Sequence, residues 1–210
     1  MTRYHNMTKG WLCVLLAVLG WTVAYAQGAW DVQTLRLHNG FTVWLNIDHS
    51  QPKVYGAVVV KAGAKDCPNT GIAHYFEHLM FKGTDKIGTV DYEKEKPWLD
   101  SISHQYDLLA ATTDAARRLT IQKHINALSV RAADYAIPNE FQNLITRFGG
   151  TGLNAYTSFD ETVFYNTFSP PYLSQWCELY AERFLSPVLR LFQGELDTVY
   201  DEKNRYSENM

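Results

Sequence analysis

Apolar and polar residues alternate from residue 32 to residue 47, on both sides of Asn39-Gly40. An Asn-Gly pair between two alternating segments is the strongest short-range signal for a hairpin turn. We therefore expect two antiparallel strands in this region. Residues 54–61 (VYGAVVVK) are rich in β-branched side chains and almost continuously apolar, which predicts a third, more central strand.

Helical spacing replaces this alternation further along the chain. Residues 72–81 suit a helix, with Gly83 placed as its C-terminal cap. Two amphipathic helices are predicted within about residues 91–135, packed as an antiparallel hairpin around a turn at Thr112-Thr113-Asp114. Their apolar stripes consist of Leu99, Ile102, Tyr106 and Leu109, and then of Ile121, Ile125, Leu128, Ala132 and Tyr135.

The last part of the chain mixes the two patterns. The predicted elements are a helix at 139–148, strands at 154–158 and 162–168, a helix starting at Pro170-Pro171 and a last helix starting near Gln193. Taken together, the patterns predict an α+β fold, in which helices pack on one face of an antiparallel sheet.

The N-terminus indicates where the protein works. Arg3 and Lys9 precede an apolar run at residues 11–23, which is followed by Ala24-Tyr25-Ala26. This order is typical of a cleavable signal peptide covering residues 1–26. A membrane anchor is the alternative, but a bilayer-spanning helix needs about 20 apolar residues. We expect an exported protein, periplasmic or extracellular, with no stable membrane span after cleavage.

Composition narrows the classes of protein further. The 210 residues are 46% hydrophobic and 20% charged, which suits one domain with a full core. The formal net charge of −3 provides no basic stripe, so nucleic acid is not expected as a partner. Signal cleavage would remove Cys13 and leave Cys67 and Cys177, of which Cys177 is predicted to be a buried thiol on a helix.

The segment His74-Tyr75-Phe76-Glu77-His78 carries the candidate chemistry. On a helix it places two imidazoles one turn apart, with a carboxylate beside them on the same face. A catalytic zinc ion takes three protein ligands and keeps a fourth position for water. Glu77, which is not needed as a ligand, could then take a proton from that water as general base.

Two other interpretations of this segment are possible. The histidines could be hydrogen-bonded core residues, but burying three polar side chains unpaired beside Phe76, Leu79 and Met80 would be costly, and a metal removes that cost. A structural zinc site is usually closed by four ligands rich in cysteine. The segment itself contains no cysteine.

HxxEH is the inverted form of the HExxH zinc motif, and the sequence resembles the pitrilysin and insulinase family of zinc peptidases here. The resemblance implies that family's α/β module, one zinc ion per chain, and a zinc metalloendopeptidase that hydrolyses extended or unfolded peptides. It rests on the hairpin at Asn39-Gly40, residues 58–60 with Gly63, 71–84 (GIAHYFEHLMFKGT), 154–162 (NAYTSFDET) and 195–202.

The same resemblance implies roles for two distant glutamates. The family's third zinc ligand is a glutamate seven residues after another glutamate, a pattern that Glu195 and Glu202 match. Glu202 is therefore the expected third ligand, and Glu195 is expected to orient one of the histidines. Spacing alone does not choose Glu202 over the other acids with suitable oxygens, which are Glu93, Glu140, Glu178 and Glu182.

Substrate contacts are implied in the same way. Asn154, Ala155 and Tyr156 resemble the start of the family's edge strand beside the metal, where an extended peptide pairs main chain to main chain. The alternative is an ordinary strand followed by a turn with Asx chemistry around Asp160.

Family members build their chamber from several related modules, and this chain has room for one. Residues 27–210 are thus expected to be a catalytic module, C-terminally truncated, that binds zinc but hydrolyses little without a C-terminal module or a partner chain. The interval between His78 and Glu202 is longer than is usual, and a helical insertion at about 91–135 accounts for the excess. A non-catalytic relative, acting as an assembly or peptide-binding subunit, is the alternative, although such relatives commonly lose motif residues.

Overall fold

The computed structural model describes residues 32–68 and 70–208. The chain divides into two compact units after Gln51. The predicted signal peptide at residues 1–26, with Cys13, lies outside the described residues. None of the described helices is long and apolar enough to cross a bilayer.

The first unit contains the predicted hairpin. Strand β1 (Val32–Arg36) pairs antiparallel with β2 (Thr42–Asn46). Gly40 adopts φ +85° in the connection, and its N–H donates to the Leu37 carbonyl at 2.9 Å. Positive φ costs glycine little, so the Asn-Gly signal located this turn correctly.

The sheet of the second unit has three antiparallel strands. They are β3 (Val54–Val60), β4 (Thr151–Thr157) and β5 (Thr162–Phe168), in the order β3-β5-β4. The prediction that β3 is the more central strand is wrong, because β5 lies between the other two. Apolar continuity did not identify the central strand, since strand order is decided by long-range pairing.

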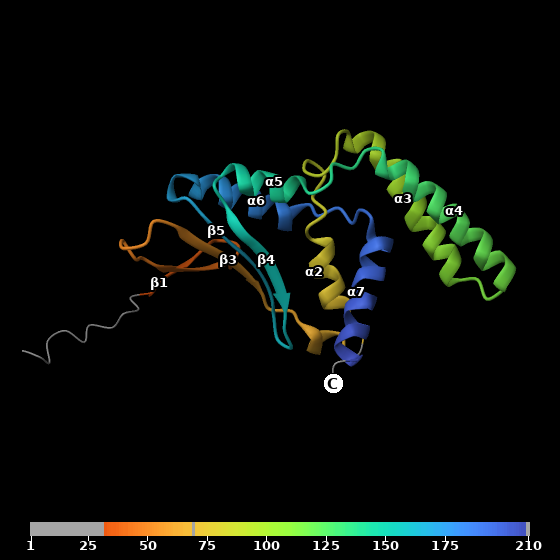
Figure 1. The fold of residues 1–210 in the computed structure, drawn as a ribbon, viewed down its shortest axis with the longest axis horizontal. Helices are drawn as coiled ribbons and strands as arrows, with labels where there is room; N and C mark the ends of the chain where they lie inside the picture. The colour runs from red at the N-terminus through yellow and green to blue at the C-terminus, as the bar shows by residue number, and fades with distance from the viewer. Residues whose placement is uncertain (1–31, 69, 209–210) are drawn as a thin grey trace, which may run out of the picture. The chain divides into compact units, whose positions relative to one another are not determined.

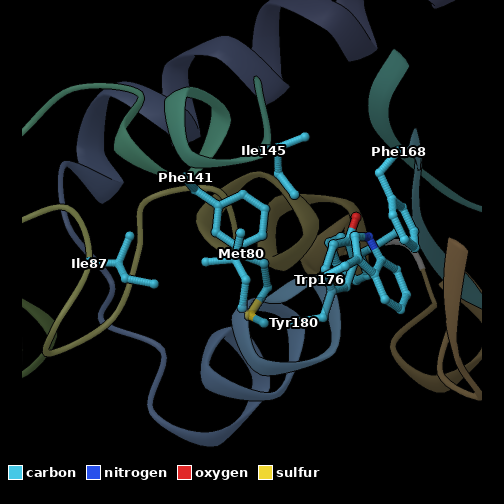
Figure 2. Close-up of a cluster of buried hydrophobic side chains, with 9 residues drawn as sticks. Met80, Ile87, Phe141, Ile145, Phe168, Trp176 and Tyr180 are labelled. Carbon is cyan, nitrogen blue, oxygen red and sulfur yellow. The ribbon is translucent and has the colours of Figure 1, made fainter. Parts of the chain in front are cut away.

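Helices cover one face of this sheet, as the α+β prediction required (Figure 1). The core lies between β5 and the helices α5 (Glu140–Arg147) and α6 (Leu173–Leu185), the latter preceded by the short 3-10 helix η2 (Pro170–Tyr172). Figure 2 shows this cluster. Its buried members are Met80, Ile87, Phe141, Ile145, Phe164, Phe168, Trp176, Leu179 and Tyr180.

Polar contacts inside this core hold α6 against the sheet. The Asn166 side chain of β5 is fully buried, and its Oδ1 accepts hydrogen bonds from Trp176 Nε1 and from the Tyr180 hydroxyl, both at 2.8 Å. The fully buried Arg183 guanidinium lies 4.3 Å from the ring centroids of Phe81 and Phe164. Its Nε donates to the Met80 carbonyl at 2.9 Å, so α6 supports the end of the helix that precedes Met80.

That helix, α2 (Ile72–Leu79), follows a 3-10 turn, η1 (Ala64–Asp66). It ends two residues earlier than predicted, with Met80 as its C-cap. Gly83 does have positive φ, at +98°, but it lies in the next turn and does not cap the helix. The Lys82 N–H bonds the Leu79 carbonyl at 3.0 Å, which tightens the chain before the glycine is reached.

The predicted helical pair is confirmed. Helices α3 (Tyr92–Ala110) and α4 (Ala115–Ala133) pack against each other, and the Asp114 side chain caps α4 by accepting from Arg117 N at 2.7 Å. Their shared core is the second buried cluster. It consists of Ile102, Ile121, Ile125 and Ala132.

Helix α7 (Phe192–Glu208) is the last element and contacts α2. The prediction of a buried thiol at Cys177 is wrong, because Cys177 is exposed on α6, as Cys67 is in its own loop. Trp176, Leu179, Tyr180 and Arg183 form the buried stripe of α6. A neighbouring residue is rotated about 100° from such a stripe, which turns Cys177 towards solvent.

Candidate active site

Helix α2 presents the two histidines of the HxxEH segment side by side. Gly71, with φ +71°, starts the helix, and His74 and His78 lie one turn apart on it. Their ring centroids are 4.9 Å apart, at an interplanar angle of 77°. The two Nε2 atoms are 3.2 Å apart, so both rings direct the same nitrogen towards one point.

Helix α7 brings Glu202 to that point. Glu202 Oε2 lies 3.4 Å from His74 Nε2 and 3.7 Å from His78 Nε2. The Tyr75 hydroxyl of α2 donates to the Phe192 carbonyl at the start of α7, at 2.6 Å. Burial, then the charges of Tyr106, Glu195 and Asp197, raises the pKa of Tyr75 to about 12, so this donor keeps its proton at neutral pH.

The three groups fit a tetrahedral metal ion. Zinc–nitrogen and zinc–oxygen bonds of about 2.0–2.2 Å imply about 3.3–3.6 Å between neighbouring ligand atoms. The distances among His74, His78 and Glu202 are 3.2, 3.4 and 3.7 Å. Among the described residues these three form a possible metal-binding group, and three ligands leave a fourth position open.

Glu195 lies on the far side of His78 from this point. Its Oε2 is 3.2 Å from His78 Nδ1, and its Oε1 is 2.5 Å from Lys82 Nζ. A carboxylate that accepts from Nδ1–H leaves the Nε2 lone pair for a metal. Sequence reasoning missed Lys82, although it lies four residues after His78 and so continues the same helical face.

Glu77 is placed differently from the three ligand candidates. Its side chain is 7% exposed, and its Oε2 accepts a hydrogen bond from the Thr157 hydroxyl of β4 at 2.6 Å. It does not belong to the group that could hold a metal. Sequence reasoning also missed Thr157, although strand alternation places it on the same side as Ala155.

A cavity of about 440 Å³ joins these groups. Of the three predicted substrate contacts, Asn154 and Ala155 line this cavity, and Tyr156 does not. The Tyr156 hydroxyl instead donates to Glu161 at 3.1 Å, and its ring lies 6.3 Å from that of Tyr165. These contacts hold the Tyr156 side chain outside the cavity.

Fold and site together define an α+β module that carries a candidate metal centre on an HxxEH helix. Residues 42–96, which include that helix, match the sequence model of the insulinase family, peptidase family M16. This match confirms the predicted family resemblance, and the matched family is a family of peptidases. No curated protein sequence matches the chain.

Solved structures that resemble this chain include two crystal structures. One is the crystal structure of a protease from Helicobacter pylori, with 23% identity and a TM-score of 0.56, covering 84% of this chain and 32% of that chain. The other is the crystal structure of pitrilysin, with 21% identity and a TM-score of 0.48, covering 78% and 12%. At this identity, the likeness to the H. pylori protease shows a shared fold. The chain spans about a third of that protease's length.

Proposed function

We propose that this chain is the zinc-binding catalytic module of a metalloendopeptidase that hydrolyses extended or unfolded peptides. One observation carries the proposal. Three ligand atoms with the spacing of a tetrahedral site share a cavity with Glu77, a carboxylate outside the ligand set. The match of the helix to a peptidase family supports the same reaction class.

His74, His78 and Glu202 would hold the zinc ion, one per chain, and Glu195 orients His78 by accepting from its Nδ1–H. Zinc bound there supplies Lewis-acid chemistry, which acidifies water and polarises a carbonyl oxygen. Lys82 neutralises the outer oxygen of Glu195. That contact holds the carboxylate in place, so the His78 ring keeps its orientation.

Glu77 acts as general base and then as general acid. Thr157 occupies its Oε2, and no described residue hydrogen-bonds its Oε1. Oε1 therefore accepts a proton from the attacking water as the C–O bond forms. The same proton passes to the amide nitrogen as the C–N bond breaks, so the products are a carboxylic acid and an amine.

Strand β4 would align the peptide. It is at the end of the three-stranded sheet, so one side of its main chain is open to another strand. A peptide added there would be recognised by its backbone in an extended form. Asn154 and Ala155, which line the cavity, are its proposed contacts, and Tyr156 would contribute only main-chain atoms.

We further propose that a C-terminal module or a partner chain completes the substrate cradle, because the chain spans 32% of the H. pylori protease.

The signal-like residues 1–26 support export to the periplasm or beyond.

Glu77→Gln tests the proposal. The wild-type chain and Glu77→Gln should each bind one zinc ion, measured by elemental analysis, and His78→Ala should lose it. With the completing module present, Glu77→Gln should hydrolyse an unstructured peptide roughly 10²- to 10⁴-fold more slowly than wild type.

Wild-type turnover by Glu77→Gln would exclude Glu77 as the base. A wild-type chain that binds no zinc would contradict the metal centre. A protein without any turnover, whose peptide binding is unchanged in Glu77→Gln, would instead be the non-catalytic subunit.

A further inference from the structure

Thr157 connects the substrate strand to the proposed base. The hydrogen bond from its hydroxyl to Glu77 Oε2 is 2.6 Å long and joins β4 to α2 across 80 residues of sequence. This length lies in the range of a charge-assisted O–H···O⁻ bond. Among the described residues, Thr157 is the only one whose side chain hydrogen-bonds the Glu77 carboxylate.

The direction of this bond follows from its neighbours. An ionised carboxylate only accepts, whereas a threonine hydroxyl has one proton to donate. Thr162 Oγ1 lies 3.4 Å from Thr157 Oγ1 but donates its own proton to the Ala62 carbonyl at 2.9 Å. The Thr162 hydroxyl therefore cannot replace Thr157 as a donor to Glu77, and the proton of Thr157 is available for Oε2.

The position of Thr157 on β4 gives the bond a second consequence. Asn154 and Ala155 of the same strand line the cavity, and the free edge of β4 is where the peptide would pair. A short stretch of strand thus separates the peptide from the residue that holds the base. The bond therefore fixes the Glu77 carboxylate relative to β4, the strand along which the scissile peptide would be aligned.

The charge of a buried arginine interacts with the same carboxylate. Burial lowers the pKa of Arg183 to about 10, and the charges of Tyr180 and Glu77 oppose this fall. Arg183 directs its Nε to the Met80 carbonyl, so it attracts Glu77 without fixing the orientation of its oxygens. Orientation is left to the directional bond from Thr157.

We propose that Thr157 is a positioning residue for Glu77: its hydroxyl occupies Oε2, presents Oε1 to the attacking water, and ties the base to the substrate strand. This rests on the proposed peptidase function. It adds a residue that the HxxEH motif does not contain.

Three variants test the role of the hydroxyl. Thr157→Val keeps the shape of the side chain and removes the donor, and Thr157→Ser restores the donor. Thr151→Val is the matched control, because it removes a hydroxyl from the exposed end of the same strand, where Thr151 contacts Thr167. For each variant, kcat and KM on an unstructured peptide, zinc content and Tm are measured with the completing module present.

Thr157→Val should lower kcat by about 10- to 100-fold, the effect of losing a hydrogen bond to a charged group. KM should stay within about twofold, since the peptide contacts are kept. Zinc content should match that of Thr151→Val, and Thr157→Ser should regain most of the lost kcat. Unchanged kcat in Thr157→Val, or no recovery in Thr157→Ser, would overturn the proposal.

A crystal structure of Thr157→Val provides a readout that does not depend on turnover. The Glu77 carboxylate should leave the position that it has in the wild-type protein, while His74 and His78 stay in place. An unmoved carboxylate would contradict the positioning role. If the wild-type protein has no turnover but Glu77 moves, then the peptidase proposal fails and the positioning contact stands.

Discussion

Two glycines shape the segment that follows the site helix. Gly83 has φ +98° and Gly88 has φ +86°, in the left-handed region that side chains disfavour. A Cβ on Gly83 would lie 2.1 Å from the Ile87 carbonyl oxygen, and one on Gly88 would lie 2.6 Å from the Lys82 carbonyl oxygen. This close backbone packing places Lys82 where it reaches Glu195.

Gly83→Ala should therefore destabilise the protein more than Gly152→Ala does. Gly152 also has positive φ, at +65°, but no atom lies within 4 Å of the Cβ that it lacks. Its substitution costs only the backbone strain, about 1–2 kcal/mol. Gly83→Ala adds an overlap with backbone that cannot move aside. Thermal unfolding of the two variants measures the difference, and equal losses of Tm would show that the packing is looser than described.

At the scale of elements, Arg190 connects the segment that follows the site helix with the segment that precedes α7. Its guanidinium makes a buried bidentate pair with Glu95 of α3, at 2.6 and 2.8 Å. It also donates to the carbonyls of Lys82 and Ile87 at 3.2 Å and of Thr84 at 2.7 Å. Arg190 thus joins the segment after α2, the start of α3 and the approach to α7.

Arg190→Met should lower the free energy of unfolding by about 3–5 kcal/mol, because it leaves the Glu95 carboxylate buried without a partner. Denaturant unfolding measures this loss. Adding Glu95→Met should restore only part of it, since the carbonyls of Lys82, Thr84 and Ile87 still have no donor from this side chain. Full recovery in the double variant would show that the carbonyl contacts contribute nothing.

At the scale of the whole molecule, the candidate centre closes a long loop of the chain. His78 and Glu195 are separated by 117 residues, and the intervening chain contains the sheet strands β4 and β5, four α-helices and the 3-10 helix η2. A metal held by α2 and α7 would therefore stabilise the folded chain as a whole.

Removal of the metal should lower Tm by about 5–10 °C, if free zinc in the untreated sample is about 100 times its Kd. Scanning calorimetry with and without a chelator measures the shift. His74→Ala, which lacks a ligand, should unfold at the same temperature in both conditions. An identical Tm for the wild-type protein with and without chelator would contradict a metal bridge between the two helices.

Local features of this chain could be predicted from the sequence alone. The hairpin at Gly40, the helical pair with its cap at Asp114 and the shared face of His74 and His78 all depend on neighbours within a few residues. Backbone geometry and side-chain periodicity act over that range, so the sequence determines them before any tertiary contact forms.

Non-local features were decided only by the tertiary structure. Residue pattern alone did not distinguish Glu202 from other acids, did not place β5 at the centre of the sheet, and did not identify Thr157 or Lys82 as partners of Glu77 and Glu195. Each of these depends on which surfaces meet when distant segments pack. The packing of these surfaces depends on how the whole chain buries its apolar residues, and it cannot be predicted from a short stretch of sequence.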